Sequence, residues 1–232
     1  MTTEIVTKEV KKAGKKAAKT AEREQKKLVS IRTRGLEVLR LRFNGVTPLL
    51  QHNVRLANPL DPYAKRLKQL TSQKNKTEEA HEDVQRAEFE GGLYCDEKIG
   101  PYMPTMSMRA SILEAGAINK LKAPMQRALL VFDLKAPLIY DGPRTPEGLW
   151  AAGEKFVDVR AAVVNGTRTI MRTRPKFEEW ACEIELHYDP MMLEEEQIVV
   201  SAELAGRFYG LGDFRPGSGG GMFGRYEVEV IK

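Results

Sequence analysis

The sequence predicts an α+β protein with an antiparallel sheet, and three observations lead to this prediction. Apolar and polar residues alternate, as in half-buried strands, at 36–43, 177–188 and 225–231. Helical patterns with apolar stripes or capping residues lie between these segments. An Asn-Gly pair at 165–166, flanked by strand-like residues, is typical of a tight hairpin that joins two antiparallel strands.

Two polar helices are predicted after the first strand and a loop at 45–60 that is rich in Gly, Pro and Asn. The first of them begins with Asp61 as N-cap and Pro62 at the first helical position. The second begins at Thr77 as N-cap and has Glu78 and Glu79 in its first turn, where acidic residues favour a helix N-terminus. Because both helices are polar on most faces, we expect a helical insertion at about 61–91 that packs on the side of the core.

The remaining chain alternates between short strands and two apolar helices. The predicted elements are a helix at 104–117, strands at 129–133 and 137–140, a Pro/Gly-rich loop at 141–148, hairpin strands at 156–164 and 167–173, a strand at 177–188, a helix at 193–209 and a final strand at 225–231.

The positive charge of the chain is concentrated at its N-terminus. The whole chain of 232 residues carries a net charge of +5, but residues 1–34 hold eleven Lys/Arg and only four Asp/Glu, which gives +7 there and −2 elsewhere. This Lys/Ala/Glu-rich stretch has too few large apolar residues to fold alone. We therefore expect a basic, disordered N-terminal arm at 1–34 and a folded core at 35–232. The arm either contacts phosphates or only solubilises the protein.

Several classes of protein are disfavoured by what the sequence lacks. No apolar run approaches the ~20 residues of a membrane helix, and the charged N-terminus does not resemble a signal peptide. The two cysteines have no C-x-x-C spacing and the three histidines no H-x-x-x-H spacing, so we expect no metal site. The sequence thus predicts a soluble, cytoplasmic protein without a cofactor and without contact to a membrane.

A glycine-rich loop at 210–224 contains seven glycines in fifteen residues. It follows a helix C-terminus and lacks G-K-[ST], which argues against a phosphate-binding P-loop. Arginines and aromatics are interleaved in and beside it, as in sites that bind the phosphates and stack on the bases of single strands. The alternative is a flexible connector. The residues predicted to bind nucleic acid here are Arg207, Gly210, Gly212, Phe214, Arg215, Gly219, Gly220, Gly221, Phe223, Gly224 and Arg225.

A second basic element surrounds the predicted hairpin turn. Because side chains alternate along a strand, Arg168, Arg172 and Arg174 are expected on one face, near Lys176 and Arg160. Arginines on one strand face lie about 7 Å apart, similar to successive phosphates of a single strand. The alternative is an ordinary solvated face in which these arginines form a ladder with glutamates, namely Glu179, Glu183 or Glu185.

Three segments resemble, in the same order, the RAMP superfamily of ferredoxin-like, RRM-like RNA-binding proteins of CRISPR systems. Gly210-Leu-Gly followed by Phe223-Gly224-Arg225-Tyr226 resembles their glycine-rich loop. The segment 101–109 is similar to the one that opens their first core helix, and Gly45-Val-Thr-Pro48 is similar to the end of their first strand. Together these segments cover about a third of the chain.

The resemblance implies a modified ferredoxin-like, βαββαβ core that binds RNA or another single strand beside the glycine-rich loop. It also implies assembly along that strand or with other subunits, and it adds Arg109 to the predicted binding residues. Two features depart from the family pattern: Ala110 and Ser111 stand where a glycine is usual, and the loop carries an extra Gly-Ser-Gly-Gly-Gly. A phage or mobile-element relative outside a CRISPR complex is therefore an equal alternative.

Two other functions remain open. Some relatives in that superfamily cut RNA without a metal by means of a histidine, and His52 lies in the loop after the first strand, where it could act in this way. Asp61, Asp141 and Asp213 are loop acids without paired spacing, and Ser107 has no identifiable base partner. The other alternative is a scaffold protein that contacts a nucleoprotein assembly through its basic arm.

Overall fold

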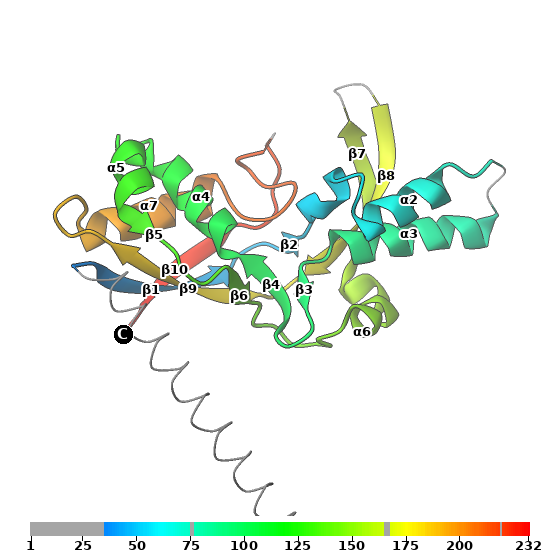
Figure 1. Cartoon of the computed structure of the whole chain (residues 1–232), viewed down its shortest axis with the longest axis horizontal. Helices are drawn as coiled ribbons and strands as arrows, with labels where there is room; N and C mark the ends of the chain where they lie inside the picture. The colour runs from blue at the N-terminus through cyan, green and yellow to red at the C-terminus, as the bar shows by residue number, and fades with distance from the viewer. Residues whose placement is uncertain (1–34, 75–76, 165–167, 219) are drawn as a thin grey trace, which may run out of the picture. The chain divides into compact units, whose positions relative to one another are not determined.

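The computed structural model describes residues 35–74, 77–164, 168–218 and 220–232 (Figure 1). The predicted basic arm at 1–34 and the Asn-Gly turn at 165–166 lie outside the described residues. The elements are β1 (Glu37–Gly45), β2 (Leu49–Leu50), η1 (Val54–Ala57), α2 (Pro62–Thr71), α3 (Glu78–Gly92), β3 (Cys95–Asp96), β4 (Gly100–Pro104), α4 (Thr105–Gly116), α5 (Lys122–Ala128), β5 (Leu129–Leu130), β6 (Lys135–Pro137), α6 (Pro146–Ala151), η2 (Gly153–Lys155), β7 (Val157–Val164), β8 (Arg168–Phe177), β9 (Ala181–Tyr188), α7 (Glu195–Phe208) and β10 (Tyr226–Ile231).

The central sheet has the strand order β10-β1-β9-β5. Strand β1 pairs antiparallel with β10, and β5 pairs antiparallel with β9. Across β1 and β9, Arg40 pairs with Glu185 and Arg42 with Glu183, so these two strands also run in opposite directions. Helices α4 and α7 pack together on one face of this sheet (Figure 1). The chain order β1-α4-β5-β9-α7-β10 with this sheet order is the ferredoxin-like fold, which confirms the predicted α+β class.

Alternation along β1 explains how the sheet acquires its two faces. Leu39, Leu41 and Phe43 are buried, and they join the same apolar cluster as Met108 and Ile112 of α4. The residues between them on β1 point to the opposite face, which carries the ion pairs with β9. Burial of the alternating apolar set therefore fixes which face of the sheet the helices cover.

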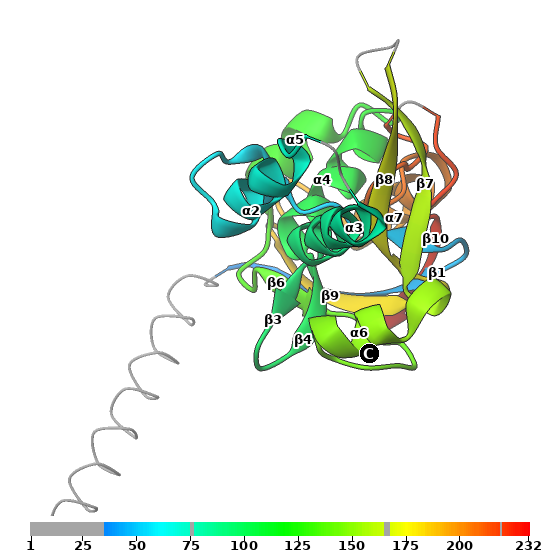
Figure 2. The same ribbon diagram turned by 90° about the vertical axis from the view of Figure 1, so that its right-hand side faces the viewer.

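Two insertions into this core build a second group of elements. The first, β2 to β4, lies between β1 and α4, and the second, β6 to β8, lies between β5 and β9. The insertions are interleaved: β2 pairs with β8, in the register Leu49↔Phe177, and β4 pairs with β6, in the register Tyr102↔Pro137. Strands β7 and β8 form a long hairpin, and α3 lies beside β8 (Figure 2). The hairpin is thereby anchored by elements from both insertions.

The helical insertion begins at the predicted caps. The Asp61 side chain accepts from the Tyr63 amide at 2.9 Å, and Thr77 accepts from the Ala80 amide at 3.3 Å. The insertion is more than a polar appendage, however, because Phe89 near the end of α3 is fully buried in the main apolar cluster. Helix α3 therefore forms part of the core that supports the hairpin.

Two short helices were not expected from the sequence. Helix α6 lies where the Pro and Gly content favoured a loop, but Pro146 occupies the first turn, and the Thr145 hydroxyl accepts from the Gly148 amide at 3.2 Å. Helix α5 lies between α4 and β5, and its buried residues are Met125 and Ala128. Strands β5 and β6 are also shorter than predicted. Within the described ranges, no helix combines the length and apolar character needed to cross a lipid bilayer.

Candidate functional site

The glycine-rich loop, residues 210–224, folds back on itself between α7 and β10. The Leu211 amide donates to the Gly224 carbonyl at 2.9 Å, and the Phe223 amide donates to the Phe214 carbonyl at 3.2 Å. The two arms of the loop thus run antiparallel at its base. The described part of this loop is consequently held by its own backbone hydrogen bonds.

The chain segment 47–50, between β1 and β2, holds the loop from outside. The Asp213 amide donates to the Leu50 carbonyl at 2.7 Å, and the Gly224 amide donates to the Pro48 carbonyl at 2.8 Å. Both ends of the loop are therefore tied to a segment more than 150 positions away in the chain.

Several glycines of the loop are required by this packing. A Cβ at Gly221 would overlap the Phe214 carbonyl, and a Cβ at Gly224, whose φ is +67°, would overlap the Leu211 carbonyl. Nothing lies within 4 Å of the corresponding position at Gly220. The base of the loop thus needs glycine for backbone packing, whereas Gly220 faces open space.

Two further glycines predicted as binding residues belong to the packed base of the loop. Gly210 and Gly212 lie in the packed base, where the Ser111 hydroxyl donates to the Gly210 carbonyl at 3.0 Å. Gly219 lies outside the described residues. The glycine content therefore reflects the internal packing of the loop as well as any contact with a ligand.

The structure brings the glycine-rich loop and the β7–β8 hairpin together. Arg174 Nε donates to Asp213 Oδ2 at 2.6 Å, and the Arg160 guanidinium lies 4.4 Å above the centre of the Phe223 ring. Phe223 in turn stacks with Phe214 at a centroid distance of 5.9 Å. The two basic, aromatic elements that the sequence predicted separately therefore form one continuous surface.

The arginines of the hairpin share a face, as the alternation predicts. In the β7–β8 register, Arg160 lies opposite Arg172, and Val164 lies opposite Arg168. Each basic side chain of this face that the structure describes has a carboxylate partner. These pairs are Arg160 with Asp158, Arg172 with Glu88 (3.6 Å), Arg174 with Asp213 (2.6 Å) and Lys176 with Glu178 (2.8 Å).

The carboxylates come from places that the sequence-based alternative did not name. Glu183 and Glu185 pair with Arg42 and Arg40 on the outer face of the central sheet instead. Glu88 approaches the hairpin from α3, where it also accepts from the Thr173 amide at 2.8 Å. The positive charge of the hairpin is therefore largely compensated within the fold.

Three arginines around the base of the glycine-rich loop differ from those of the hairpin. Among the described residues, no carboxylate lies within ion-pair distance of Arg207, Arg215 or Arg225. Arg215 Nη1 donates to the Gly212 carbonyl at 2.9 Å, and Arg225 Nη1 donates to the Arg207 carbonyl. These contacts orient two of the guanidinium groups but leave their charge uncompensated.

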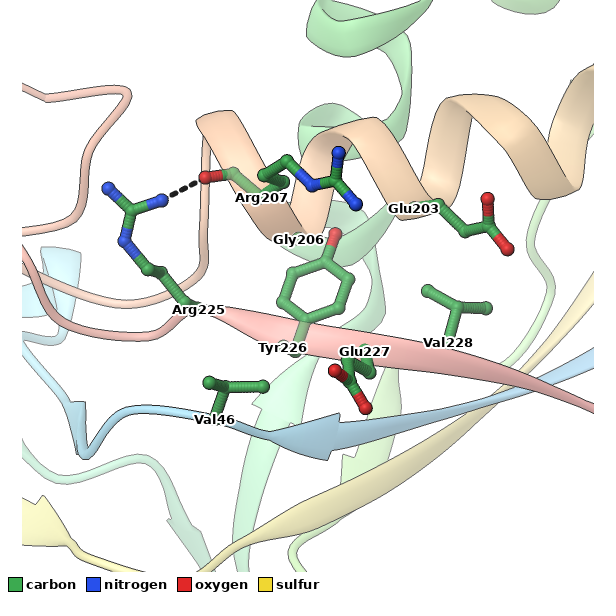
Figure 3. A pocket seen from close by; sticks show the side chains of 8 residues that line it. All are labelled: Val46, Glu203, Gly206, Arg207, Arg225, Tyr226, Glu227 and Val228. Atoms are coloured by element: carbon green, nitrogen blue, oxygen red, sulfur yellow. Dashed lines mark hydrogen bonds between the residues drawn. The ribbon is translucent and has the colours of Figure 1, made fainter.

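A first cavity of about 430 Å³ lies beside these arginines, between α7 and β10 (Figure 3). Figure 3 shows the Arg225 and Arg207 side chains at the end of the cavity next to the loop, and Glu203 and Val228 toward its other end. Tyr226 lies below Arg207 in this view, and Glu227, which also lines the cavity, lies below Tyr226. The end of the cavity next to the loop is therefore suited to an anion.

A second cavity, of about 510 Å³, lies at the other side of the loop. It is bounded by the chain after β2, by α4 and by residues 209–217. Its lining includes polar, aromatic and apolar side chains, among them His52, Tyr94, Met103, Ser107, Tyr209 and Arg215. The two cavities thus flank the glycine-rich loop, and each of them receives at least one uncompensated arginine.

The charged groups near the loop shift one another's pKa values. Burial lowers the pKa of His52, and the charges of Arg172 and Arg174 lower it further, against the opposing effect of Asp213. For Asp213 itself, burial raises the pKa, but the charge and hydrogen bond of Arg174 outweigh it, so that the net pKa lies below the usual value. His52 is therefore neutral and Asp213 ionised at pH 7.

The other predicted residues lie elsewhere in the fold. Arg109 donates to the Leu129 carbonyl at 2.6 Å and to the Gln126 carbonyl at 3.0 Å, and so holds the end of α5. Asp61 caps α2, and Asp141 is fully exposed and faces Lys155 at 3.6 Å. In the described part of the chain, no cluster of three or more His, Cys, Asp or Glu side chains is placed to hold a metal ion.

The likeness of this chain to known proteins is to solved structures. No family model matches the chain. No curated protein matches it either. Among solved structures, a chain in the cryo-EM structure of the Type III-B Cmr-beta bound to cognate target RNA is similar, with 14% sequence identity and a TM-score of 0.43. The alignment covers 94% of this chain and 68% of that chain.

Sequence reasoning missed Glu88 and Tyr94, and it named Asp213 only as a loop acid without a partner. Glu88 and Asp213 compensate the hairpin arginines, and Tyr94 lines the second cavity. No local signal identifies Glu88, which lies among many acids on a polar helix. Asp213 is the exception, because a single acid inside an arginine-containing glycine-rich loop is a candidate partner for one of the nearby cations.

Proposed function

We propose that the protein binds single-stranded nucleic acid, RNA or DNA, largely without base specificity, along a path across the glycine-rich loop. The observation that carries this proposal is the contrast between two sets of arginines. Those of the hairpin are paired with carboxylates, whereas Arg207, Arg215 and Arg225 around the loop have no carboxylate partner among the described residues. Cations without a partner are the groups that gain most from contact with phosphate.

The aromatic side chains beside these arginines add a stacking surface. Phe214 is 45% exposed and stacks on Phe223, whose ring is also contacted by the Arg160 guanidinium. Stacking of a base on an exposed aromatic ring contributes about 1–3 kcal/mol and depends little on the identity of the base. The hairpin residues Arg172 and Lys176 extend this surface, with weaker expected contributions because carboxylates compensate them. Arg174 is buried and holds Asp213 of the loop, and Arg168 stays a predicted contact.

Replacing Arg207 and Arg225 together by Gln is expected to weaken binding of a 20-nucleotide single strand at least tenfold at about 100 mM salt. The logarithm of the binding constant falls linearly with the logarithm of the salt concentration, and each phosphate contact on a single strand contributes about 0.7 to the steepness of this slope. Loss of two contacts is therefore expected to reduce the steepness by about 1.4. Fluorescence anisotropy at several salt concentrations, with labelled RNA and DNA, measures both quantities. Full-length protein is compared with residues 35–232, so that any contribution of the basic arm is measured separately.

Arg40→Gln with Arg42→Gln is the matched control. These two arginines pair with Glu185 and Glu183 on the outer face of the sheet, and their loss changes the net charge by the same amount. The control is expected to bind within about twofold of the wild type. Equal losses in both variants would show a general charge effect and contradict the proposed site, as would unchanged binding in Arg207→Gln/Arg225→Gln.

The proposal includes kinship with the RAMP superfamily and assembly of several copies, or of this chain with other subunits, along one strand. The ferredoxin-like core and the position of the loop before the last strand support it. A phage or mobile-element relative fits the same features. A scaffold function through the basic arm remains the competing hypothesis, and it requires that residues 35–232 alone bind no strand.

A second candidate function is metal-independent cleavage of RNA by His52, favoured by its position in the second cavity with a lowered pKa. A neutral imidazole could accept the proton of a 2′-hydroxyl. Because its pKa lies below the usual 6.5, the rate is expected to rise with pH, to be half-maximal below pH 6.5 and then to level off. A gel assay on hairpin RNA should then show a 2′,3′-cyclic phosphate product that His52→Ala abolishes. Equal cleavage by His52→Ala, or no cleavage by the wild type, would contradict this function.

A further inference from the structure

We propose that the second cavity binds one nucleotide of the strand, with its base inside the cavity and its phosphate at Arg215. This inference rests on the proposed function and adds a specific subsite to it. The cavity encloses about 510 Å³, within the range of about 300–1,000 Å³ that is typical of small-ligand sites. It opens next to the glycine-rich loop, where the proposed path of the strand passes.

The lining matches the chemistry of a nucleoside. Met103 and Leu211 contribute apolar surface, and Tyr94 and Tyr209 contribute aromatic rings. A base is a flat aromatic ring that carries polar groups only along its edges. A cavity with apolar and aromatic surface and a few polar groups therefore suits it better than it suits a sugar or a simple anion.

Polar groups in the cavity keep unused hydrogen-bonding capacity. The Tyr94 hydroxyl accepts from the Val54 amide at 3.3 Å, and its own proton is left to donate. His52 and Ser107 make no side-chain hydrogen bond within the described part of the chain, and a neutral imidazole offers one donor and one acceptor. These groups can meet the donors and acceptors of a base edge or of the ribose hydroxyls.

Arg215 supplies the site for the phosphate. Its Nη1 donates to the Gly212 carbonyl at 2.9 Å, which fixes the guanidinium at the loop and leaves its other N–H groups available. Glu114 lines the opposite, α4 side of the cavity and pairs with Lys122 at 2.8 Å. A carboxylate there disfavours a phosphate, so the phosphate is expected at Arg215 and the base deeper in the cavity.

The test fills the cavity without disturbing the core. Ala110 is exposed on α4 and lines the cavity, so Ala110→Trp is expected to occlude it and still fold. Met106, 52% exposed on the same helix and not part of the lining, gives the matched control Met106→Trp. Isothermal titration of full-length protein with 5′-AMP and 5′-UMP, with adenosine and with inorganic phosphate, measures binding. Circular dichroism spectra confirm that each variant is folded.

We expect both nucleotides to bind wild type and Met106→Trp equally, and Ala110→Trp at least tenfold more weakly. Adenosine and phosphate are expected to bind more weakly than 5′-AMP, since each offers only part of the contacts. Unchanged nucleotide binding in Ala110→Trp, or inorganic phosphate binding as tightly as 5′-AMP, would overturn the inference. So would a wild type that does not bind nucleotides.

A strand-binding assay on the same variants separates this inference from the proposed function. Ala110→Trp is expected to weaken binding of a 20-nucleotide RNA about three- to tenfold, and to leave the contribution of Arg207 and Arg225 intact. If wild type binds the strand but Ala110→Trp binds it equally well, the subsite is wrong and the proposed function stands. If wild type binds 5′-AMP but no strand, the proposed function is wrong, and with it the role of the cavity as a strand subsite.

Discussion

Replacing Asp213 by alanine is expected to lower the free energy of unfolding by about 3 kcal/mol. Arg174 is only 7% exposed, its Nε bonds to Asp213, and its Nη1 has no hydrogen-bond partner among the described residues. Without the carboxylate, a buried cation is left uncompensated, which costs about 3–5 kcal/mol at fully buried sites. The Asp213 side chain is 32% exposed, so we expect the low end of that range. Urea unfolding followed by circular dichroism measures the change.

Two controls test the cause of this loss. Asp141→Ala removes an equal charge at a fully exposed side chain that faces Lys155, and it should leave the free energy of unfolding almost unchanged. In the background of Arg174→Met, Asp213→Ala should cost much less, because no buried cation remains. Equal costs of Asp213→Ala in both backgrounds would contradict the ion pair as the cause.

The same pair predicts how stability depends on pH. The pKa of Asp213 is depressed in the folded state, so its contribution is present above the usual value of 3.8 and is lost as the pH falls through the folded pKa. The difference between wild type and Asp213→Ala is therefore expected to be constant near neutral pH and to shrink below about pH 4.

Replacing Gly224 by alanine is expected to lower the free energy of unfolding by about 3 kcal/mol. Its φ of +67° disfavours any residue with a Cβ, and the added methyl group would overlap the Leu211 carbonyl. The overlap separates the two arms of the loop at their base, so we also expect weaker strand binding. Urea unfolding and the anisotropy assay on one preparation measure both effects.

Gly220→Ala separates backbone strain from packing. Its φ is +78°, but nothing lies within 4 Å of the new methyl group. Only the conformational cost of about 1 kcal/mol is therefore expected. If both alanine variants lost the same stability, the overlap with Leu211 would not be the cause of the larger effect.

Local patterns were sufficient to predict most helices and the central strands. The caps at Asp61 and Thr77 satisfy exposed amides within three residues, and the apolar stripe of α4 follows from helical periodicity. Such signals depend only on neighbours in the sequence. The pairing of β2 with β8 is different, because two residues, Leu49 and Leu50, provide too little pattern to identify a partner strand more than 100 positions away.

The same distinction applies to the site. The alternation of side chains along a strand correctly placed Arg172 and Arg174 on one face of the hairpin. The net charge of this face depends on Glu88 and Asp213, which only the tertiary fold brings close to these arginines. The glycines of the loop are predicted as residues that bind nucleic acid. Several of them also allow one backbone segment to approach another within the protein, which local sequence does not reveal.

The interleaved insertions also constrain the order in which the chain folds. Strand β2 leaves the ribosome long before its partner β8, as the pairing of Leu49 with Phe177 shows, and β4 leaves it before its partner β6. Until then their edges are unpaired, which is the condition that favours non-native association. Pairings between such distant segments slow the search for the native state. The surface around the glycine-rich loop is therefore completed last, when β8 and β10 have both been synthesised, so that a chain that stops before β10 cannot present it.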